Sequence, residues 1–203
     1  MFVIIEGPSG VGKTTLAREL AAVTAAPVYR AFRGADAHIN ARTIHAMQDL
    51  GLSVNGWEED MYIADLMATV NASVILDRSM PSGLAWNEAS SCALLPGQRR
   101  AVVRLWCERI VAARASLVLL TCDAETRRRR VSPERFGDWE AVGISKAVQE
   151  VLVYRASHRA DLTMLSVNTD RIDPADIAQA LARRIVHGVR RAFITEMTDG
   201  CDC

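Results

Sequence analysis

A short segment near the start of the chain has the residue types and spacing of a loop that binds phosphate. It reads Gly7-Pro8-Ser9-Gly10-Val11-Gly12-Lys13-Thr14-Thr15 and fits the pattern G-x-x-x-x-G-K-[ST] over its whole length. Glycines let such a loop curl so that its backbone N–H groups face phosphate oxygens, and the helix that follows adds its free N-terminal N–H groups. The segment therefore predicts a site for a nucleoside triphosphate such as ATP.

Two side chains of this segment have expected roles of their own. We expect Lys13 to reach the β and γ phosphates as a catalytic group, and the Thr14 hydroxyl to bind Mg²⁺. Only two of the 24 basic residues are lysines, Lys13 and Lys146, so a lysine at this place is informative. The expected nucleotide-binding residues are Gly7, Ser9, Gly10, Val11, Gly12, Lys13, Thr14 and Thr15.

A second polar cluster follows an apolar segment, in Val74-Ile75-Leu76-Asp77-Arg78-Ser79. Asp77 can help hold Mg²⁺ or orient the attacking oxygen, and Arg78 can grip the phosphate of an acceptor through its planar guanidinium. By itself, an Asp-Arg pair after a strand is as often a solvated turn. Together with the phosphate loop, the pair favours phosphoryl transfer with Asp77 and Arg78 as catalytic residues.

Four consecutive arginines, Arg127 to Arg130, form a third cluster, which Arg135 follows at a short distance. On a helix, Arg127 and Arg130 share one face because they are three residues apart. We expect Arg127, Arg130 and Arg135 to contact the transferring phosphoryl group from a lid over about residues 127–140, which excludes water. The alternative is a solvated basic helix face, which two of the four arginines must form in any case.

Apolar residues alternate along the chain between short strand-like runs and longer runs with helical spacing. This alternation predicts an α/β fold, a five-stranded parallel sheet with helices on both faces, in one domain over residues 1–203 with a loose tail at about 191–203. Ligands of such sheets bind beyond the carboxyl ends of the strands. The expected strands cover about 2–6, 27–31, 73–77, 117–122 and 163–167. The expected helices cover about 13–25, 37–50, 58–71, 82–115, 124–131, 144–159 and 174–189.

Composition argues against several classes of protein. The 203 residues carry 24 basic and 24 acidic side chains without a basic stripe, which argues against binding to a nucleic acid polymer. The apolar run over residues 1–5 is too short for a signal peptide or a membrane span, so we expect a cytoplasmic protein that does not bind a membrane. The five scattered cysteines fit neither a disulfide framework nor a zinc site.

The segment from Asp77 to Trp86 resembles the thymidylate kinase family of nucleoside monophosphate kinases. That family has an Asp-Arg-aromatic triplet, then a Ser and an Ala-aromatic pair, and the chain reads Asp77-Arg78-Ser79-Met80-Pro81-Ser82-Gly83-Leu84-Ala85-Trp86. The resemblance runs along most of the chain and implies the fold of P-loop kinases, with ATP and Mg²⁺ as cofactors. It implies a catalytic role for Asp77, acceptor-phosphate binding by Arg78, and substrate binding by Ser82 and Trp86. Ser79 departs from the aromatic, and deoxynucleoside kinases carry a similar acid-Arg-Ser triplet.

The same resemblance implies an acceptor pocket in the first third of the chain. Arg30 keeps the position of an Arg that helps bind the acceptor phosphate in the family, and Arg33 adds positive charge nearby. Tyr62 corresponds to an aromatic that stacks on the base, whereas Leu66 replaces an Arg that hydrogen-bonds it. Ser9 replaces an acid that contacts the sugar of the acceptor. We therefore expect an acceptor other than dTMP, favouring another deoxypyrimidine or a modified pyrimidine nucleotide.

Taken together, these patterns predict an enzyme that transfers a phosphoryl group from ATP to a nucleoside monophosphate, giving the diphosphate. The alternative is a nucleoside or other small-molecule kinase on the same fold. A regulatory GTPase is disfavoured because the sequence has no Asn-Lys-x-Asp motif for reading a guanine base. The expected partner is the nucleotide substrate, and a homodimer stays open.

Overall fold

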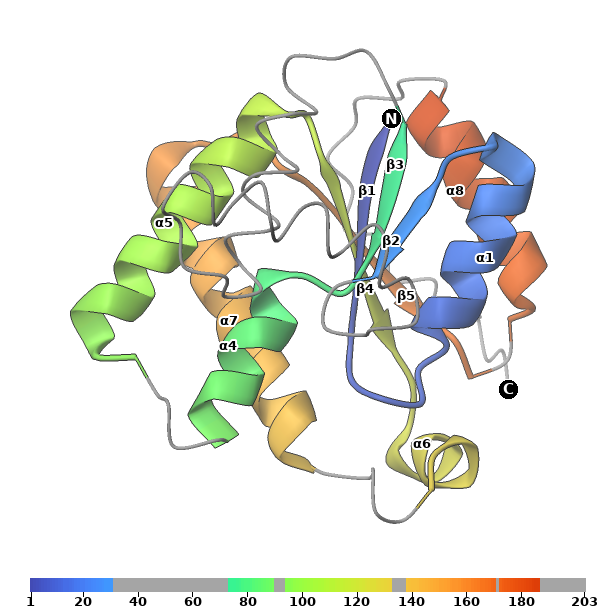
Figure 1. Ribbon diagram of the computed structural model, residues 1–203, viewed down its shortest axis with the longest axis horizontal. Coiled ribbons are helices and arrows are strands. Elements are labelled where there is room, and N and C mark those ends of the chain that lie inside the picture. Colours follow the sequence, from blue (N-terminus) through green and yellow to red (C-terminus); the bar gives the residue numbers. More distant parts are fainter. Residues whose placement is uncertain (31–72, 90–93, 133–137, 171, 187–203) are drawn as a thin grey trace, which may run out of the picture.

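Five short apolar segments form a parallel sheet in the computed structural model of the chain, which describes residues 1–30, 73–89, 94–132, 138–170 and 172–186 (Figure 1). The strands are β1 (Phe2–Glu6), β2 (Val28–Arg30), β3 (Val74–Asp77), β4 (Ser116–Thr121) and β5 (Thr163–Asn168). Their order across the sheet is β2-β3-β1-β4-β5, and each neighbouring pair is parallel. The predicted five-stranded parallel sheet is confirmed. Because β1 lies between β3 and β4, the segments that follow these three strands meet at one edge of the sheet.

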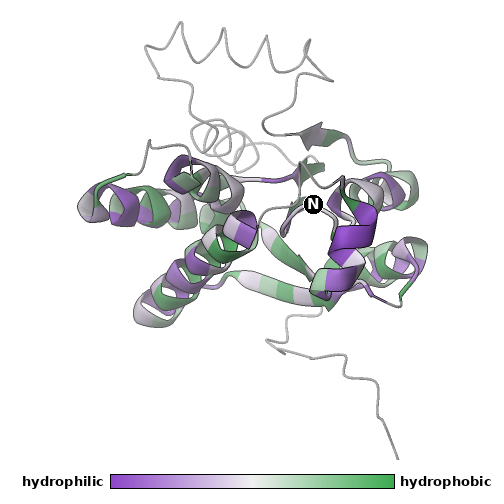
Figure 2. Cartoon of the chain, turned by 90° about the horizontal axis from the view of Figure 1, so that it is seen from below, coloured by the Kyte–Doolittle hydropathy of each residue, from purple (hydrophilic) through white to green (hydrophobic). Residues whose placement is uncertain are grey.

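Alternating side chains of the sheet build two separate cores. The helices on one face are α4 (Met80–Ala89), α5 (Pro96–Ala112) and α7 (Asp138–His158), and those on the other are α1 (Lys13–Thr24) and α8 (Pro174–Val186) (Figure 1). Phe2 and Ile4 of β1 join the core with α4, α5 and α7. Val3 and Ile5 join the core with α1 and α8. Figure 2 shows hydrophobic residues recurring along the strands, while hydrophilic patches are spread over the helices. Burial on both faces explains the uninterrupted apolar run of β1.

The helices differ from the sequence-based expectation in two places. The sequence predicts one helix over residues 82–115, whereas α4 ends at Ala89 and α5 begins at Pro96. Proline lacks an N–H and suits the first turn of a helix, so it marks a new start rather than a helix interior. α7 begins at Asp138 instead of at about residue 144. This longer start places Glu140 on a helix that runs beside α4.

Gly143 brings the first part of α7 close to α4. A Cβ atom on Gly143 would lie 2.6 Å from the Cβ atom of Ala85, closer than two carbon atoms approach without a shift. Packing therefore requires a residue without a side chain at this point of α7. The close contact fixes the end of α7 that carries Glu140.

Several predicted features fall outside the described residues. They are the helices expected at 37–50 and 58–71, residues 133–137 of the expected lid, and the expected tail at 191–203. The short helix α6 (Ala124–Arg130), which begins the expected lid, is present as predicted. In the part of the chain that the structure describes, none of the helices has the length and apolar character needed to cross a membrane.

Candidate active site at the phosphate loop

The phosphate loop joins β1 to α1 and has a backbone that its glycines permit. Gly7, Gly10 and Gly12 have φ angles of 143°, 87° and 92°, which residues with a side chain rarely adopt. At Gly10 the surroundings are also closed, because a Cβ atom would lie 2.6 Å from Cγ2 of Val131 and 3.1 Å from the carbonyl oxygen of Arg127. Glycine at this position is thus required both by the backbone and by the close approach of α6.

Side chains from α1, from α6 and from the residue after β5 donate hydrogen bonds to carbonyl oxygens of the loop. Four consecutive residues accept these hydrogen bonds: Pro8 from Lys13 Nζ at 2.7 Å, Ser9 from Arg127 Nε at 3.2 Å, Gly10 from Arg130 Nη1 at 3.5 Å, and Val11 from Thr169 Oγ1 at 2.9 Å. Bonds on the carbonyl oxygens favour the curled form in which backbone N–H groups can bind an anion. The loop is therefore held in shape before any nucleotide binds.

Lys13, the first residue of α1, is buried beside the loop. Burial and the neighbouring Arg78 guanidinium lower the pKa of its ammonium group from 10.5 to about 8. The carboxylates of Glu140, Glu6 and Asp77 act in the opposite direction but do not cancel this effect. An anionic phosphate beside the ammonium group would raise its pKa again. The position thus suits a lysine whose charge is completed by a phosphate ligand.

Thr14, in the first turn of α1, and Asp77, at the end of β3, supply two adjacent oxygen atoms. The Thr14 hydroxyl donates a hydrogen bond of 2.6 Å to Oδ2 of Asp77, the buried last residue of β3. A hydroxyl and a carboxylate oxygen are hard ligands of the kind that Mg²⁺ prefers, and this ion usually completes its shell with water and phosphate oxygens. The residues present therefore fit the expected magnesium site.

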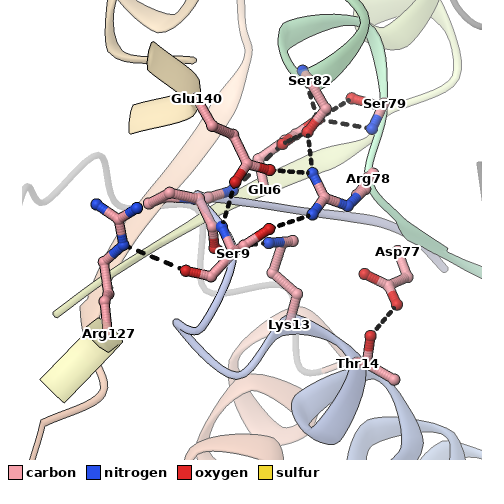
Figure 3. Close-up of polar contacts among 12 residues, drawn as sticks. Glu6, Ser9, Lys13, Thr14, Asp77, Arg78, Ser79, Ser82, Arg127 and Glu140 are labelled. Atoms are coloured by element: carbon pink, nitrogen blue, oxygen red, sulfur yellow. Dashed lines mark hydrogen bonds and ion pairs between the residues drawn. The ribbon is translucent and has the colours of Figure 1, made fainter. Parts of the chain in front are cut away.

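Arg78 follows β3 and reaches across to the loop and to α7 (Figure 3). Its Nη1 atom donates to Oε1 of Glu140 at 2.6 Å and to the Ser82 hydroxyl at 3.3 Å, and its Nη2 atom donates to the Ser9 hydroxyl at 3.1 Å. The backbone at Arg78 has a φ of 83°, which costs about 1–2 kcal/mol for a residue with a side chain. Strain of this kind is typical of functional sites, and here it turns the guanidinium toward the phosphate loop.

Glu6 is a site residue that the sequence analysis did not identify. It ends β1, is fully buried, and accepts hydrogen bonds from the backbone N–H groups of Gly7, Ser79 and Ser82 and from both serine hydroxyls, at 2.6–3.3 Å. Burial raises the pKa of its carboxyl group, against the effect of the Ser82 hydrogen bond and of Arg78. Glu6 thereby fixes the start of α4 relative to the phosphate loop. An acid that closes an otherwise apolar strand was the available signal.

Glu140, in the first turn of α7, is the second residue that the sequence analysis did not identify. Its Oε2 atom accepts a hydrogen bond of 2.7 Å from the backbone N–H of Ser9, and its Oε1 atom pairs with Arg78. Burial opposes ionisation of this carboxyl group, but Arg78 and the donors of Ser9 outweigh it and lower the pKa. Glu140 is therefore a buried carboxylate directly on the phosphate loop (Figure 3).

The arginines of the expected lid reach the phosphate loop, but on its carbonyl oxygens. Besides its contact to Gly10, Arg130 donates to the hydroxyl and carbonyl oxygens of Thr169 at 3.4 and 3.1 Å. Arg129 pairs with Glu125 and is largely exposed, as expected for the solvated face. A role of Arg127 and Arg130 on the transferring phosphoryl group stays a prediction, and Arg135 lies outside the described residues.

The expected acceptor-binding residues are only partly described. Arg30 ends β2 with its backbone opposite Asp77 in the sheet, whereas Arg33, Tyr62 and Leu66 lie outside the described residues. The Ser82 hydroxyl is buried and donates to Oε2 of Glu6 at 2.7 Å.

Trp86, also expected to bind the acceptor, is exposed on α4. It packs against Trp139 of α7, which was not expected at the site, with ring centroids 5.9 Å apart and ring planes at 65°. Trp139 immediately precedes Glu140, so an exposed aromatic pair stands next to the buried carboxylate.

Comparison with solved structures finds several molecules to which the chain is similar. The YorR protein from Bacillus subtilis, determined in complex with phosphorylated GDP, has 19% sequence identity and a TM-score of 0.55, with 95% of this chain and 100% of that chain covered. Deoxyadenosine kinase from M. mycoides with bound dCTP has 12% identity and a TM-score of 0.49, with 93% and 100% covered. Shikimate kinase from Acinetobacter baumannii in complex with shikimate has 15% identity and a TM-score of 0.45, with 93% and 94% covered.

These likenesses bear on the architecture of the chain. No family model matches the chain, and no curated protein matches it either. Together with the strand order, the likeness to the YorR protein confirms the predicted α/β fold with a five-stranded parallel sheet.

Proposed function

We propose that the chain is an ATP- and Mg²⁺-dependent phosphotransferase whose acceptor is a nucleoside monophosphate. One observation carries the proposal: the Nη2 atom of Arg78 donates a hydrogen bond of 3.1 Å to the hydroxyl of Ser9 in the phosphate loop. The guanidinium that would bind the acceptor is therefore in direct contact with the loop that would bind the triphosphate. An acceptor phosphate held by Arg78 would lie beside the γ-phosphate, which is the placement that transfer requires.

The described residues divide the work of such a transfer between them. The loop N–H groups and Lys13 would bind the phosphates of ATP and balance the charge that develops on the transferring group. Thr14 and Asp77 would hold Mg²⁺, which draws negative charge from the phosphate oxygens when it is bound. Arg78 would hold the acceptor phosphate, and Glu6 would keep Arg78 and the loop in register through the start of α4.

The resemblance to thymidylate kinases supports a pyrimidine nucleotide as acceptor, with dTMP disfavoured. That preference depends on Leu66 and Ser9, and Leu66 lies outside the described residues. Ser9 has its hydroxyl bonded to Arg78, so its side chain serves the guanidinium rather than standing open to a sugar. The hydrogen bond between Arg78 and Ser9 therefore supports an acceptor that is bound differently near Ser9 than in the thymidylate kinase family.

A second candidate function is phosphorylation of a nucleoside or another small molecule with a free hydroxyl. The observation that favours it is the pairing of Arg78 with Glu140 at 2.6 Å, which already satisfies the guanidinium with a carboxylate. An acceptor without a phosphate would leave this pair intact.

A transfer assay with labelled ATP and Mg²⁺ tests the proposal and separates the two candidates. Purified protein is offered each nucleoside and each nucleoside monophosphate in turn, guanine nucleotides included because the similarly folded YorR protein was determined with phosphorylated GDP. We expect transfer to a monophosphate. Transfer only to nucleosides would favour the second candidate. Absence of transfer to every nucleoside and monophosphate would contradict the first candidate and restrict the second to other small molecules.

The variant Arg78→Ala sharpens this assay. Loss of a charge-assisted contact is worth about 1.5–3 kcal/mol, so the KM for a monophosphate should rise by about tenfold to a hundredfold. The KM for ATP should change much less. An unchanged acceptor KM would remove the phosphate-binding role of Arg78.

A further inference from the structure

The Glu140 carboxylate lies between two donors of the kind that bind phosphate. One is the backbone N–H of Ser9 in the phosphate loop, 2.7 Å from Oε2, and the other is Nη1 of Arg78, 2.6 Å from Oε1. Peptide N–H groups of such loops and arginine guanidinium groups are the common protein ligands of phosphate oxygens. The carboxylate thus fills a place built for an anion (Figure 3).

A phosphate oxygen and Glu140 cannot use these donors at the same time. The Ser9 N–H has one hydrogen to donate, and Glu140 receives it. The Nη1 atom of Arg78 has two hydrogens, and it already contacts Glu140 and the Ser82 hydroxyl. Two anions so close together would also repel each other in surroundings that exclude most water.

We propose that Glu140 is a specificity-determining residue, which competes with the phosphate of the acceptor for Arg78 while its other carboxylate oxygen is held by the Ser9 N–H of the phosphate loop. A phosphate-bearing acceptor binds there only by displacing the carboxylate. This inference rests on the proposed function, because it concerns the acceptor side of the same site. The site would then select acceptors that can replace the Glu140 carboxylate on Arg78.

The packing of α7 allows the carboxylate to leave without moving the helix. Gly143 holds this end of α7 against Ala85, whereas the Glu140 side chain turns about three single bonds. A doubly charged phosphate offers more charge and more acceptor oxygens than a carboxylate and can replace it. A neutral hydroxyl or a single carboxylate cannot, so such compounds are poor competitors for Arg78.

The affinity for inorganic phosphate, measured by titration calorimetry without any transfer reaction, tests this inference. We expect Glu140→Gln to bind phosphate about tenfold more tightly than the unaltered protein, since one like charge beside the anion is removed. The matched control is Glu150→Gln, which removes a carboxylate of the same helix that pairs with Arg99. It should leave the phosphate affinity unchanged.

The double variant Arg78→Ala with Glu140→Gln shows where the gain arises. If phosphate and Glu140 share Arg78, the double variant should lose the tenfold gain. Unchanged or weaker phosphate binding by Glu140→Gln would overturn the inference. So would a gain that persists without Arg78, or an equal gain in the Glu150→Gln control.

Two further comparisons keep a structural role apart from competition. If Glu140 only supports the structure, Glu140→Gln should weaken the binding of phosphate and of an uncharged nucleoside alike. If Glu140 competes with phosphate, the variant should raise the affinity for phosphate alone. Should Glu140→Gln not fold, Glu140→Asp shortens the side chain by one methylene, and we expect it to bind phosphate several-fold more tightly. Unchanged phosphate affinity in a folded Glu140→Asp protein would equally overturn the inference.

Failure of this inference differs visibly from failure of the proposed function. A protein that transfers no phosphoryl group to any acceptor but binds phosphate more tightly as Glu140→Gln would refute only the function. A protein that phosphorylates monophosphates but shows no gain with Glu140→Gln would refute only the competition.

Discussion

The phosphate loop is held in different ways on its two sides. On one side, which we call the carbonyl side, Arg127, Arg130 and Thr169 donate to carbonyl oxygens of the loop. On the other, which we call the carboxylate side, Glu6 and Glu140 accept hydrogen bonds from the loop and from the residues that follow β3. Main-chain oxygens cannot leave the loop, but a side-chain carboxylate can exchange with another anion. The carbonyl side therefore fixes the shape of the loop, whereas on the carboxylate side Glu6 fixes the start of α4 and Glu140 is the group that can respond to ligand.

The variant Lys13→Ala tests most directly whether the phosphate loop takes part in the reaction. Loss of a preorganised charge at the transferring group costs about 3–4 kcal/mol, so turnover should fall by about two to three orders of magnitude. Circular dichroism should show an unchanged fold. Near-normal turnover in the folded variant would remove the loop from the reaction.

Within the carboxylate side, Glu6 should matter to folding more than any donor on the carbonyl side. Glu6→Ala leaves several buried donors unsatisfied and should lower the free energy of unfolding by about 3 kcal/mol. Thr169→Ala on the carbonyl side should cost about 1 kcal/mol. Urea unfolding of both variants measures the difference, and equal losses would contradict the role of Glu6 in holding the start of α4.

On the carbonyl side, Arg127→Ala should affect ATP binding and turnover together. The arginine shapes the loop through the Ser9 carbonyl oxygen, so we expect ATP affinity to fall by about tenfold, corresponding to about 1.4 kcal/mol. Arg129→Ala is the matched control, since Arg129 belongs to the same helix but pairs with exposed Glu125. A loss of turnover without a loss of ATP affinity would instead place Arg127 on the transferring phosphoryl group, as the sequence first suggested.

The smallest expected effect concerns the proton on Lys13. Its lowered pKa of about 8 means that the free protein at pH 8.5 holds a mixture of charged and neutral lysine. ATP favours the charged form, so its binding should take up a fraction of a proton, and its affinity should weaken as the pH rises through about 8. Calorimetry in two buffers of different ionisation enthalpy measures this uptake.

The same lowered pKa has a defined sign for stability. Between about 8 and 10.5 the unfolded chain binds more protons at this residue than the folded one, so Lys13 contributes stability that increases with pH in this window. Glu140→Gln removes one carboxylate that raises the pKa of Lys13, so the proton uptake on ATP binding should begin at lower pH. An unchanged uptake profile would mean that the carboxylate side does not influence Lys13.

The sequence predicted the parts of this site that are local in the chain. The phosphate loop and the Asp77-Arg78 pair are each continuous in sequence. The alternation of strands with helices predicted that both lie at the carboxyl ends of neighbouring strands. Glu140 was not predicted as a site residue because its contact to Ser9 joins residues 131 positions apart, and no local sequence pattern encodes such a contact. Glu6 was not predicted as a site residue because the groups that satisfy its buried carboxyl oxygens belong to Ser79 and Ser82, which lie far along the chain.

Helix boundaries failed for a related reason. Helical spacing continues through residues 82–115, and only the proline at 96 marks a new helix in that stretch. The early start of α7 has acidic residues in its first turn, Asp138 and Glu140, which are favourable at a helix N-terminus, and its packing against α4 brings Gly143 beside Ala85. The predicted base-binding residues Tyr62 and Leu66 stay predictions because they lie outside the described residues.

The edge-on pair of Trp86 and Trp139 gives the protein an optical signal beside its site. Indole rings 5.9 Å apart couple their electronic transitions, and both rings are exposed, so their emission depends on the local surroundings. Trp106, in contrast, is fully buried in the core with α5 and contributes a constant background. Because Trp139 precedes Glu140 on α7, we expect a ligand that moves this carboxylate to change the emission of the pair. Unlabelled protein can therefore be screened against mixtures of acceptors by its own fluorescence, with Trp139→Phe as the blank.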